Sequence, residues 1–230
     1  MKKAYFLSFV LLCGVMLLER TAMAWDVIYD GSVMPNDPAL GPCQWGTYMS
    51  DLSNCSSDGN DLHVSDQRTD AYAVFSRFAA PKDSPLTVEA RVRVPNGDGT
   101  VLYAGTPTFY TLALLYSDRI SVSFAPSPYA TYTADLSLFR TIRIATDSQG
   151  QSYVWLDGDL LAQGLTSMGN QGDVLFGSIS AAGVNESYWD YVAYSNDFLP
   201  VPEPASLLAL AGGLAGVAIG AMRRRRHVLQ

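Results

Sequence analysis

The chain has 230 residues, a formal net charge of −7 and a hydrophobic content of 48%. Its central segment, residues 25–200, holds 20 acidic and 8 basic side chains and therefore a net charge of −12. A surface this acidic repels phosphate backbones and anionic lipids, so the composition argues against nucleic-acid binding and favours attraction of divalent cations.

The first 24 residues have the pattern of a secretory signal peptide. Lys2 and Lys3 precede an apolar run over residues 4–18, and residues 22–24 read Ala-Met-Ala, which places small residues at the cleavage positions. An uncleaved membrane anchor is the alternative, but the run is shorter than the roughly 20 residues that a span needs. We therefore expect an exported protein whose mature chain begins at Trp25.

Two cysteines, Cys43 and Cys55, remain in the mature chain. They lie in the segment 32–66, which is rich in Asn, Asp, Ser, Gly and Pro and predicts long surface loops. In an oxidising compartment an even pair predicts a disulfide, which would stabilise the fold by about 3 kcal/mol in the chain-entropy model. A zinc site is the alternative, but it needs more ligands than His63, the one histidine of residues 25–200, can add.

A period of two marks the segment Leu86–Val94 as a strand with one core face and one wet face. Val88, Ala90, Val92 and Val94 share the first face, and Thr87, Glu89, Arg91 and Arg93 share the second. A cluster of turn residues follows at Pro95–Gly99, and the strand pattern resumes at Thr100–Tyr103. We expect these two strands to form a hairpin.

Further short strands are predicted, each followed by turn residues. They are Tyr110–Tyr116, Ile120–Phe124, Thr141–Thr146, Tyr153–Leu156 and Asp190–Tyr194. The pair Asp157-Gly158 stands between two apolar segments, which predicts a tight hairpin turn. No stretch has a helical period, so the chain predicts one all-β domain over residues 25–200, an antiparallel sandwich or barrel, with the sandwich favoured.

Three stretches of this domain resemble the concanavalin A-like lectin and glucanase superfamily, which includes laminin G-like domains. They are RTIRIATDSQGQSYVWLDGDLLAQG at residues 140–164, SYWDYVAYS at residues 187–195 and the opening WDVIYDGSVMPNDP at residues 25–38. The resemblance implies a jelly-roll sandwich of two curved antiparallel sheets.

The residues argue against catalysis in this domain. Retaining glycosidases of the superfamily carry an E-x-D-x-x-E strand motif that holds two carboxyl groups about 5 Å apart, and this sequence lacks it. The two glutamates of the domain, Glu89 and Glu186, lie far apart in the chain, and a Ser-His-Asp hydrolase would depend on His63 in a polar loop. We expect a protein that is not an enzyme, with a divergent glycoside hydrolase or polysaccharide lyase as the alternative.

Aromatic and basic side chains on the predicted strands favour carbohydrate binding. Sugar rings pack their C–H faces on aromatic rings, so we predict a glycan platform, with core packing as the alternative for each ring. The candidate ligand residues are Tyr110, Tyr116, Trp155, Arg91 and Arg93, with Arg143 beside them.

The resemblance also implies a structural Ca²⁺ ion. Related domains hold calcium with a carboxylate of the late Trp-Asp strand and carbonyls near the first strand, which selects Asp190 with Asp30 or Gly31 as partner. An ordinary hydrogen bond is the alternative role for an aspartate on a strand.

The last 30 residues form a tail with three parts. Pro202, Glu203 and Pro204 precede 18 uncharged residues at 205–222 and four arginines, Arg223, Arg224, Arg225 and Arg226. Eighteen residues make about 27 Å of helix, barely enough to cross a bilayer, and the arginines would stay cytoplasmic. The tail at 201–230 resembles the PEP-CTERM sorting signal of Gram-negative bacteria.

This resemblance implies an exosortase, a membrane cysteine transpeptidase, as partner. The protein would pass through an inner-membrane intermediate and then reach the cell surface or extracellular matrix. The sequence thus predicts a sorted surface protein whose domain binds polysaccharide or has a structural role, with a protein-binding adhesion module as a further alternative.

Overall fold

The computed structural model describes residues 25–48, 51–66, 72–79, 85–124, 129–168, 172–179 and 185–200. The predicted signal peptide at 1–24 and the predicted tail at 201–230 lie outside these residues. Among the described residues, no helix is long and apolar enough to cross a membrane. The chain divides into two units at Leu199 and Pro200, and the fold described below belongs to the first unit.

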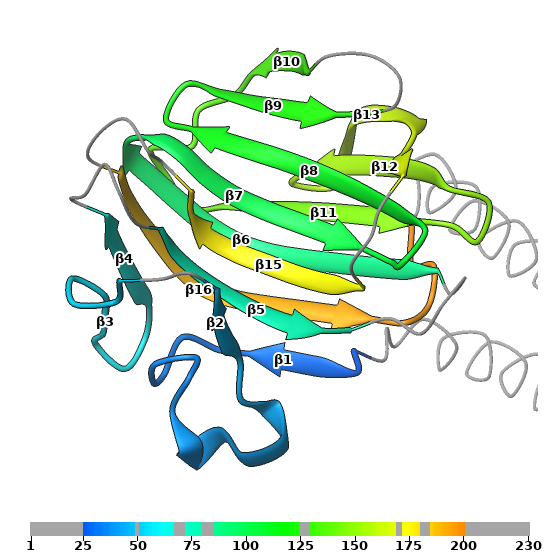
Figure 1. Cartoon of the computed structure of the whole chain (residues 1–230). Helices are drawn as coiled ribbons and strands as arrows, with labels where there is room; N and C mark the ends of the chain where they lie inside the picture. The colour runs from blue at the N-terminus through cyan, green and yellow to red at the C-terminus, as the bar shows by residue number, and fades with distance from the viewer. Residues whose placement is uncertain are drawn as a thin grey trace, which may run out of the picture. The chain divides into compact units, whose positions relative to one another are not determined.

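Two antiparallel sheets pack face to face in this unit (Figure 1). The first, sheet A, has the order β13 (Asp159–Leu165), β12 (Gln151–Leu156), β11 (Arg140–Thr146), β6 (Leu86–Asn96), β16 (Asn185–Ser195), β4 (Leu62–Asp66) and β3 (Ser56–Ser57). An eighth strand, β1 (Val27–Tyr29), pairs with the end of β16 that β4 leaves open.

The second sheet, sheet B, also has eight strands. Its order is β10 (Ala130–Thr133), β9 (Arg119–Ser123), β8 (Phe109–Tyr116), β7 (Asp98–Gly105), β15 (Asp173–Ser178), β5 (Ala73–Phe78) and β2 (Gly46–Tyr48), with β14 (Ser167–Met168) paired to β8. The expected all-β sandwich is therefore confirmed at the level of two antiparallel sheets, and each predicted strand lies within or overlaps an observed one.

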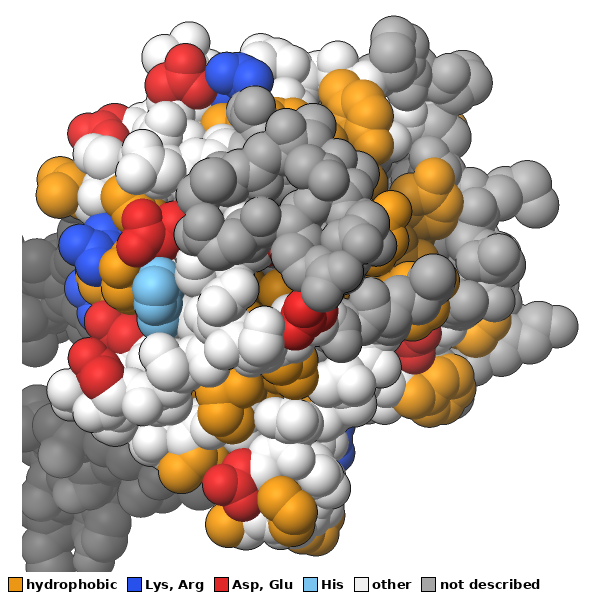
Figure 2. Space-filling view, turned by 60° about the vertical axis from the view of Figure 1, so that its left-hand side comes forward, with side chains coloured by type: hydrophobic (Ala, Val, Ile, Leu, Met, Phe, Trp, Pro, Cys, Tyr) orange, Lys and Arg blue, Asp and Glu red, His pale blue; other side chains and the backbone are white. Residues whose placement is uncertain are grey.

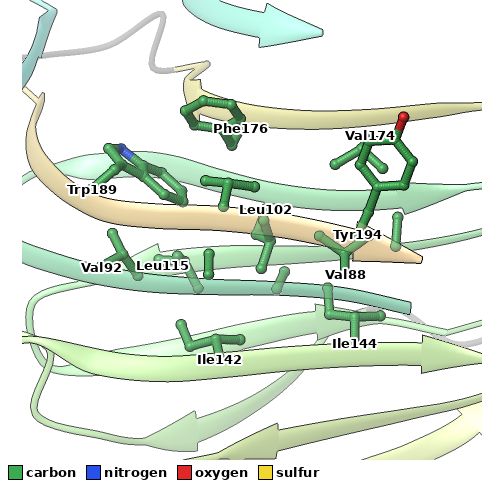
Figure 3. Close-up of a cluster of buried hydrophobic side chains, with 14 of the residues drawn as sticks. Val88, Val92, Leu102, Leu115, Ile142, Ile144, Val174, Phe176, Trp189 and Tyr194 are labelled. Carbon is green, nitrogen blue, oxygen red and sulfur yellow. The ribbon is translucent and has the colours of Figure 1, made fainter. Parts of the chain in front are cut away.

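The core fills the space between the sheets, where side chains from both inner faces meet (Figure 3). On β6 the predicted alternation holds, because Val88, Ala90, Val92 and Val94 are fully buried. Phe176 on β15 lies at the centre of an aromatic cluster, with ring centroids 5.0 Å from both Trp45 and Trp189. The opposite face of β6 is not uniformly wet as predicted, because Thr87 and Glu89 are also buried and only Arg91 is exposed.

A buried polar chain links the two sheets at one end of the core. Thr100 of sheet B donates to the side chain of Asn185, which donates to Ser178 at 2.8 Å, and Ser178 donates to Asp66 of sheet A at 3.0 Å. Buried polar groups are expensive unless they are paired, so this chain fixes the relative position of the sheets.

The predicted Asp157-Gly158 hairpin is confirmed. Both residues have positive φ, 51° and 92°, as a type I′ turn requires, and they join β12 to β13. Asp157 also accepts hydrogen bonds from the Arg140 side chain and the Thr141 backbone, so its side chain ties the turn to β11.

The predicted hairpin at Pro95–Gly99 is wrong. Strand β6 pairs with β11 and β16 in sheet A, whereas β7 pairs with β8 and β15 in sheet B. The chain therefore crosses from one sheet to the other at Gly97, whose φ is 138°, and a Cβ there would overlap Asn185. The glycine is needed for close packing at the crossing rather than for a hairpin turn.

The early loop segment contains short elements that sequence did not predict. A 3₁₀ turn covers Pro38–Cys43, with the Asp37 carboxylate accepting from the backbone N–H of Ala39. The 3₁₀ turn has no 3.6-residue apolar period to reveal it, since it is held by the proline and the cap.

Candidate functional site

The predicted glycan platform does not exist as one surface. Tyr110 and Tyr116 lie on β8 and face outward from sheet B, whereas Trp155, Arg91 and Arg93 are on strands of sheet A, away from its inner face. The outer faces of two packed sheets point in opposite directions, so the prediction joined residues that the sandwich separates. Each face is described separately below.

A stacked pair of tyrosines lies on the outer face of sheet B. The rings of Tyr103 on β7 and Tyr110 on β8 have centroids 5.4 Å apart and planes 22° apart. Gly105 stands opposite Tyr110 in the ladder, and a Cβ at Gly105 would overlap the Tyr103 ring. The glycine therefore makes room for the ring to lie along its own strand.

A carboxyl group that has no partner among the described residues lies beside this pair. The side chain of Asp173 on β15 makes no hydrogen bond or ion pair within the described part of the chain. Burial raises the pKa of its carboxyl group above the ordinary aspartate value. Burial raises the pKa of Tyr103 to about 12, with smaller contributions from Tyr110 and Asp173, which places the three groups close together.

Tyr129 extends this surface, which we call the tyrosine face (Tyr103, Tyr110, Tyr129 and Asp173). Its side chain is 48% exposed, and its pKa is raised by partial burial and then by Tyr110 and Tyr116. Tyr116 itself is less available, because the Arg119 guanidinium carbon lies 3.9 Å from its ring centroid. The face thus combines aromatic rings, phenol hydroxyls and one carboxyl group.

Two of the predicted ligand residues on sheet A are buried and serve the fold. Trp155 is only 6% exposed and stacks on Tyr153 with centroids 5.7 Å apart. Arg143 donates to Glu89 at 2.6 Å, and the other carboxylate oxygen of Glu89 accepts from Tyr191 at 2.7 Å. The predictions for Trp155 and Arg143 as ligand contacts are therefore wrong, because both side chains are buried.

The rest of the outer face of sheet A carries charged and aromatic side chains in alternation. Arg91 pairs with Asp190 at 2.6 Å, and His63 stacks on Tyr188 with ring centroids 4.5 Å apart. The Glu186 carboxylate accepts from the Tyr188 hydroxyl at 2.7 Å and lies 3.1 Å from His63 Nε2. Figure 2 shows acidic, basic and histidine side chains gathered at one side of the view, next to hydrophobic ones.

Hydrogen bonding lowers the pKa of Glu186 and favours its ionised form. The Tyr188 hydroxyl first, and the neighbouring His63, hold the pKa of the Glu186 carboxyl below its usual value. An ionised glutamate in this position orients His63, which lies on β4 rather than in the loop that the sequence predicted.

The two glutamates of the domain do not form a catalytic pair with each other. Glu89 stands opposite Ala193 in the ladder between β6 and β16, and Glu186 stands opposite Asn96. Seven residues of strand separate the two positions, which is roughly 23 Å at 3.3 Å per residue. Glycoside hydrolysis by a carboxyl pair needs about 5 Å or about 6.5–9.5 Å between the groups.

The predicted calcium partners are near each other in the backbone, but their carboxylates have other partners. A Cβ at Gly31 would lie 2.9 Å from the Asp190 carbonyl oxygen, which confirms the proximity of the first and last strands. The Asp190 carboxylate pairs with Arg91, and the Asp30 carboxylate accepts from the Ser32 hydroxyl at 2.6 Å. Within the described residues no group of three or more His, Cys, Asp and Glu could hold a metal, so calcium binding stays a prediction.

The structure does not show the predicted disulfide, which stays a prediction. Cys43 and Cys55 are free thiols that pack against the edge of the core. Burial raises the pKa of the Cys55 thiol to about 11, so this cysteine acts as a small apolar side chain with little thiolate to react.

Tyr103 and Asp173 are functional candidates that sequence reasoning missed. Tyr103 stood at the end of a predicted strand, followed after one residue by a glycine, which is a signal for close backbone or ring approach. Asp173 begins β15, a buried strand between turn residues that the alternation pattern did not reveal.

Several solved structures share this fold at low sequence identity. A carbohydrate esterase of the Shiga toxin-encoding bacteriophage phi24B has 11% identity and a TM-score of 0.53 over 74% of this chain and 97% of its own. A sialidase has 13% identity and a TM-score of 0.51 over 72% of this chain but only 18% of its own. The botulinum neurotoxin serotype G binding domain has 10% identity and a TM-score of 0.50 over 73% of this chain and 47% of its own.

These likenesses show the fold alone, and this chain spans less than a fifth of the sialidase. A comparison with curated protein sequences gives no significant match. Residues 200–226 match the family model of the PEP-CTERM protein-sorting motif, which includes the predicted Pro-Glu-Pro triplet and the four arginines. In the sequence, the β-sandwich is thus followed by a PEP-CTERM motif, which indicates export and sorting through an exosortase.

Proposed function

We propose that the protein is a non-catalytic, glycan-binding protein of the cell surface or extracellular matrix. An exosortase delivers it by way of an inner-membrane intermediate and removes the tail. The sorting motif at 200–226 supports the delivery. The Asp-Gly hairpin and the Trp-Asp strand next to β6 support a concanavalin A-like jelly roll as the class of the sandwich.

The tyrosine face is the proposed carbohydrate site. The observation that carries the proposal is Asp173, a partly buried carboxyl group beside the Tyr103–Tyr110 stack that no side chain or backbone group of the described chain satisfies. A sugar offers what this surface lacks, because its hydroxyls donate to a carboxylate while its C–H face packs on a ring. Protein binding would instead favour a larger apolar patch without a partly buried acid beside it.

Oligosaccharide binding tests this function. The full chain, purified in a mild detergent, is screened on an array of neutral glycans, and the affinity for the best ligand is measured by calorimetry. We expect Tyr110→Ala to weaken binding about tenfold, which corresponds to about 1.4 kcal/mol. Asp173→Asn keeps the shape and removes the charge, and it should weaken binding by a similar factor.

Tyr153→Ala is the matched control, because it also removes one ring of a stacked pair, but on sheet A. Equal losses in Tyr110→Ala and Tyr153→Ala would contradict the assignment of the site to sheet B. If no glycan on the array bound, the proposed carbohydrate function itself would be refuted.

A further inference from the structure

Arg93 differs from the other arginines of the described residues. Five of them have polar partners: Arg77 donates to Tyr194 and two backbone carbonyls, and Arg91, Arg119, Arg140 and Arg143 each pair with a carboxylate. The side chain of Arg93 makes no hydrogen bond or ion pair within the described chain, and its Nε is buried without a partner. A guanidinium has five N–H donors, and leaving one buried and unmatched costs free energy.

Two aromatic rings hold this side chain in place. The guanidinium carbon of Arg93 lies 4.2 Å from the centroid of Tyr188 and 5.3 Å from that of Phe139. Such contacts fix the plane of the guanidinium without using its N–H groups. The donors of Arg93 are therefore positioned before any ligand arrives.

The neighbouring acids are already engaged. Glu186 accepts from Tyr188 and lies against His63, and Asp190 pairs with Arg91. Asp61 has a pKa raised by burial and by Asp190 and Asp58, while Arg93 and Arg91 act in the opposite direction. The positive charge of Arg93 thus lowers the pKa of Asp61 although no hydrogen bond or ion pair joins the two side chains. Asp61 therefore competes with any external anion for this charge.

We propose that Arg93 is a second ligand site, which binds an oxyanion carried by a polysaccharide, either the carboxylate of a uronic acid or a sulfate ester. The planar fork of an arginine matches both groups with two parallel hydrogen bonds. This site is on sheet A and takes a charged ligand, so it is independent of the tyrosine face.

Binding of defined oligosaccharides to the full chain tests the proposal. The probes are hexagalacturonate, its neutral methyl ester, and a sulfated galactan hexasaccharide, which separates a carboxylate ligand from a sulfate ligand. We expect the wild type to bind at least one charged probe about tenfold more tightly than the methyl ester. Equal binding of all three probes, or of none, would overturn the proposal.

Variants then locate the site. Arg93→Lys keeps the charge but loses the fork and should weaken binding of the charged probe about tenfold, a loss of about 1.4 kcal/mol. Asp61→Asn removes the competing acid and should strengthen binding of the charged probe. A purely structural role of Arg93 would not produce this gain. Arg119→Gln, also stacked on a tyrosine but on sheet B, is the matched control and should leave affinity unchanged. Unchanged affinity in Arg93→Lys together with no gain in Asp61→Asn would refute the assignment.

Discussion

The buried ion pair between Glu89 and Arg143 gives a sharp prediction about stability. Glu89 is one of two glutamates in the domain, so a catalytic hypothesis would depend on it, whereas its contacts indicate a structural role. The side chains of Arg143 and Glu89 are only 9% and 12% exposed, and both carboxylate oxygens accept hydrogen bonds. Burial and Glu89 raise the pKa of Tyr191, so its hydroxyl stays a donor to the carboxylate at all physiological pH values.

Glu89→Gln leaves the Arg143 cation buried without a counter-charge. Breaking a buried pair in this way costs about 3 kcal/mol. For a domain of this size the urea dependence is about 2 kcal/mol per molar, so the midpoint of unfolding should fall by about 1.5 M. Urea unfolding followed by tryptophan fluorescence measures the shift.

Glu186→Gln is the control, because Glu186 and His63 are both about 30% exposed and such a pair contributes about 0.5 kcal/mol. Replacing both Glu89 and Arg143 by methionine should recover most of the loss, since no unpaired charge remains. A Glu89→Gln midpoint that matches that of Glu186→Gln would show that the reasoning about burial is wrong.

Three further predictions concern Asp173, Cys55 and the tail. Because the pKa of Asp173 is higher in the folded than in the unfolded protein, its ionised form disfavours folding. Asp173→Asn should therefore raise the urea midpoint at pH 7, and this gain should disappear once the pH falls below the ordinary aspartate pKa. An unchanged midpoint at pH 7 would contradict the burial of Asp173. With a pKa of about 11, Cys55 is only about one thousandth thiolate at pH 8, so iodoacetamide should label it slowly in the folded protein and quickly in urea, and an intact mass two hydrogens lower would instead indicate a disulfide. Replacing Pro202, Glu203 and Pro204 by alanine should leave the protein in the membrane at its larger mass, and wild-type surface protein that still carries Arg226 by mass spectrometry would exclude processing.

Strand positions were predictable where one face is buried, and sheet membership was not. The alternation on β6 identifies Val88 and Val92 as inward residues and Arg91 and Arg93 as outward ones, as observed. The same parity rule places Tyr110 outward, yet outward from the other sheet. The alternation shows only whether a side chain points inward or outward from its own strand. The pairing of strands that are distant in the sequence decides to which sheet, and so to which outer face, the residue belongs.

Turn composition has the same limit. The Asp157-Gly158 turn was predicted because both φ values must be positive in a two-residue hairpin. The cluster around Gly97 contains similar residues, but there the chain passes between sheets, and the reason is the contact of Gly97 with Asn185, 88 residues later in the chain. Local sequence shows that the chain turns, and only tertiary packing shows where it goes.

The partners of the charged residues depend on irregularities in β16. Register shifts occur between Glu186 and Tyr188 and between Trp189 and Tyr191, so this strand does not keep a simple alternation against β6. The second shift places Asp190 where it meets Arg91, while Arg93 meets an aromatic ring instead. Bulges of this kind have no reliable sequence signal, which explains why the sequence did not reveal that Arg93 lacks a polar partner among the described residues.

The charge of the domain sets how the two proposed sites should respond to salt. A net charge of −12 over residues 25–200 repels an acidic polysaccharide at long range, and this repulsion is screened beyond about 8 Å at physiological ionic strength. The contact of Arg93 with an oxyanion is short and partly shielded, so salt weakens it less. The two effects oppose each other, and affinity at Arg93 should change little with salt, unlike the steep loss of a basic protein on a polyanion. Neutral sugars on the tyrosine face involve neither effect, so steep salt dependence of a charged probe would indicate binding elsewhere than at Arg93.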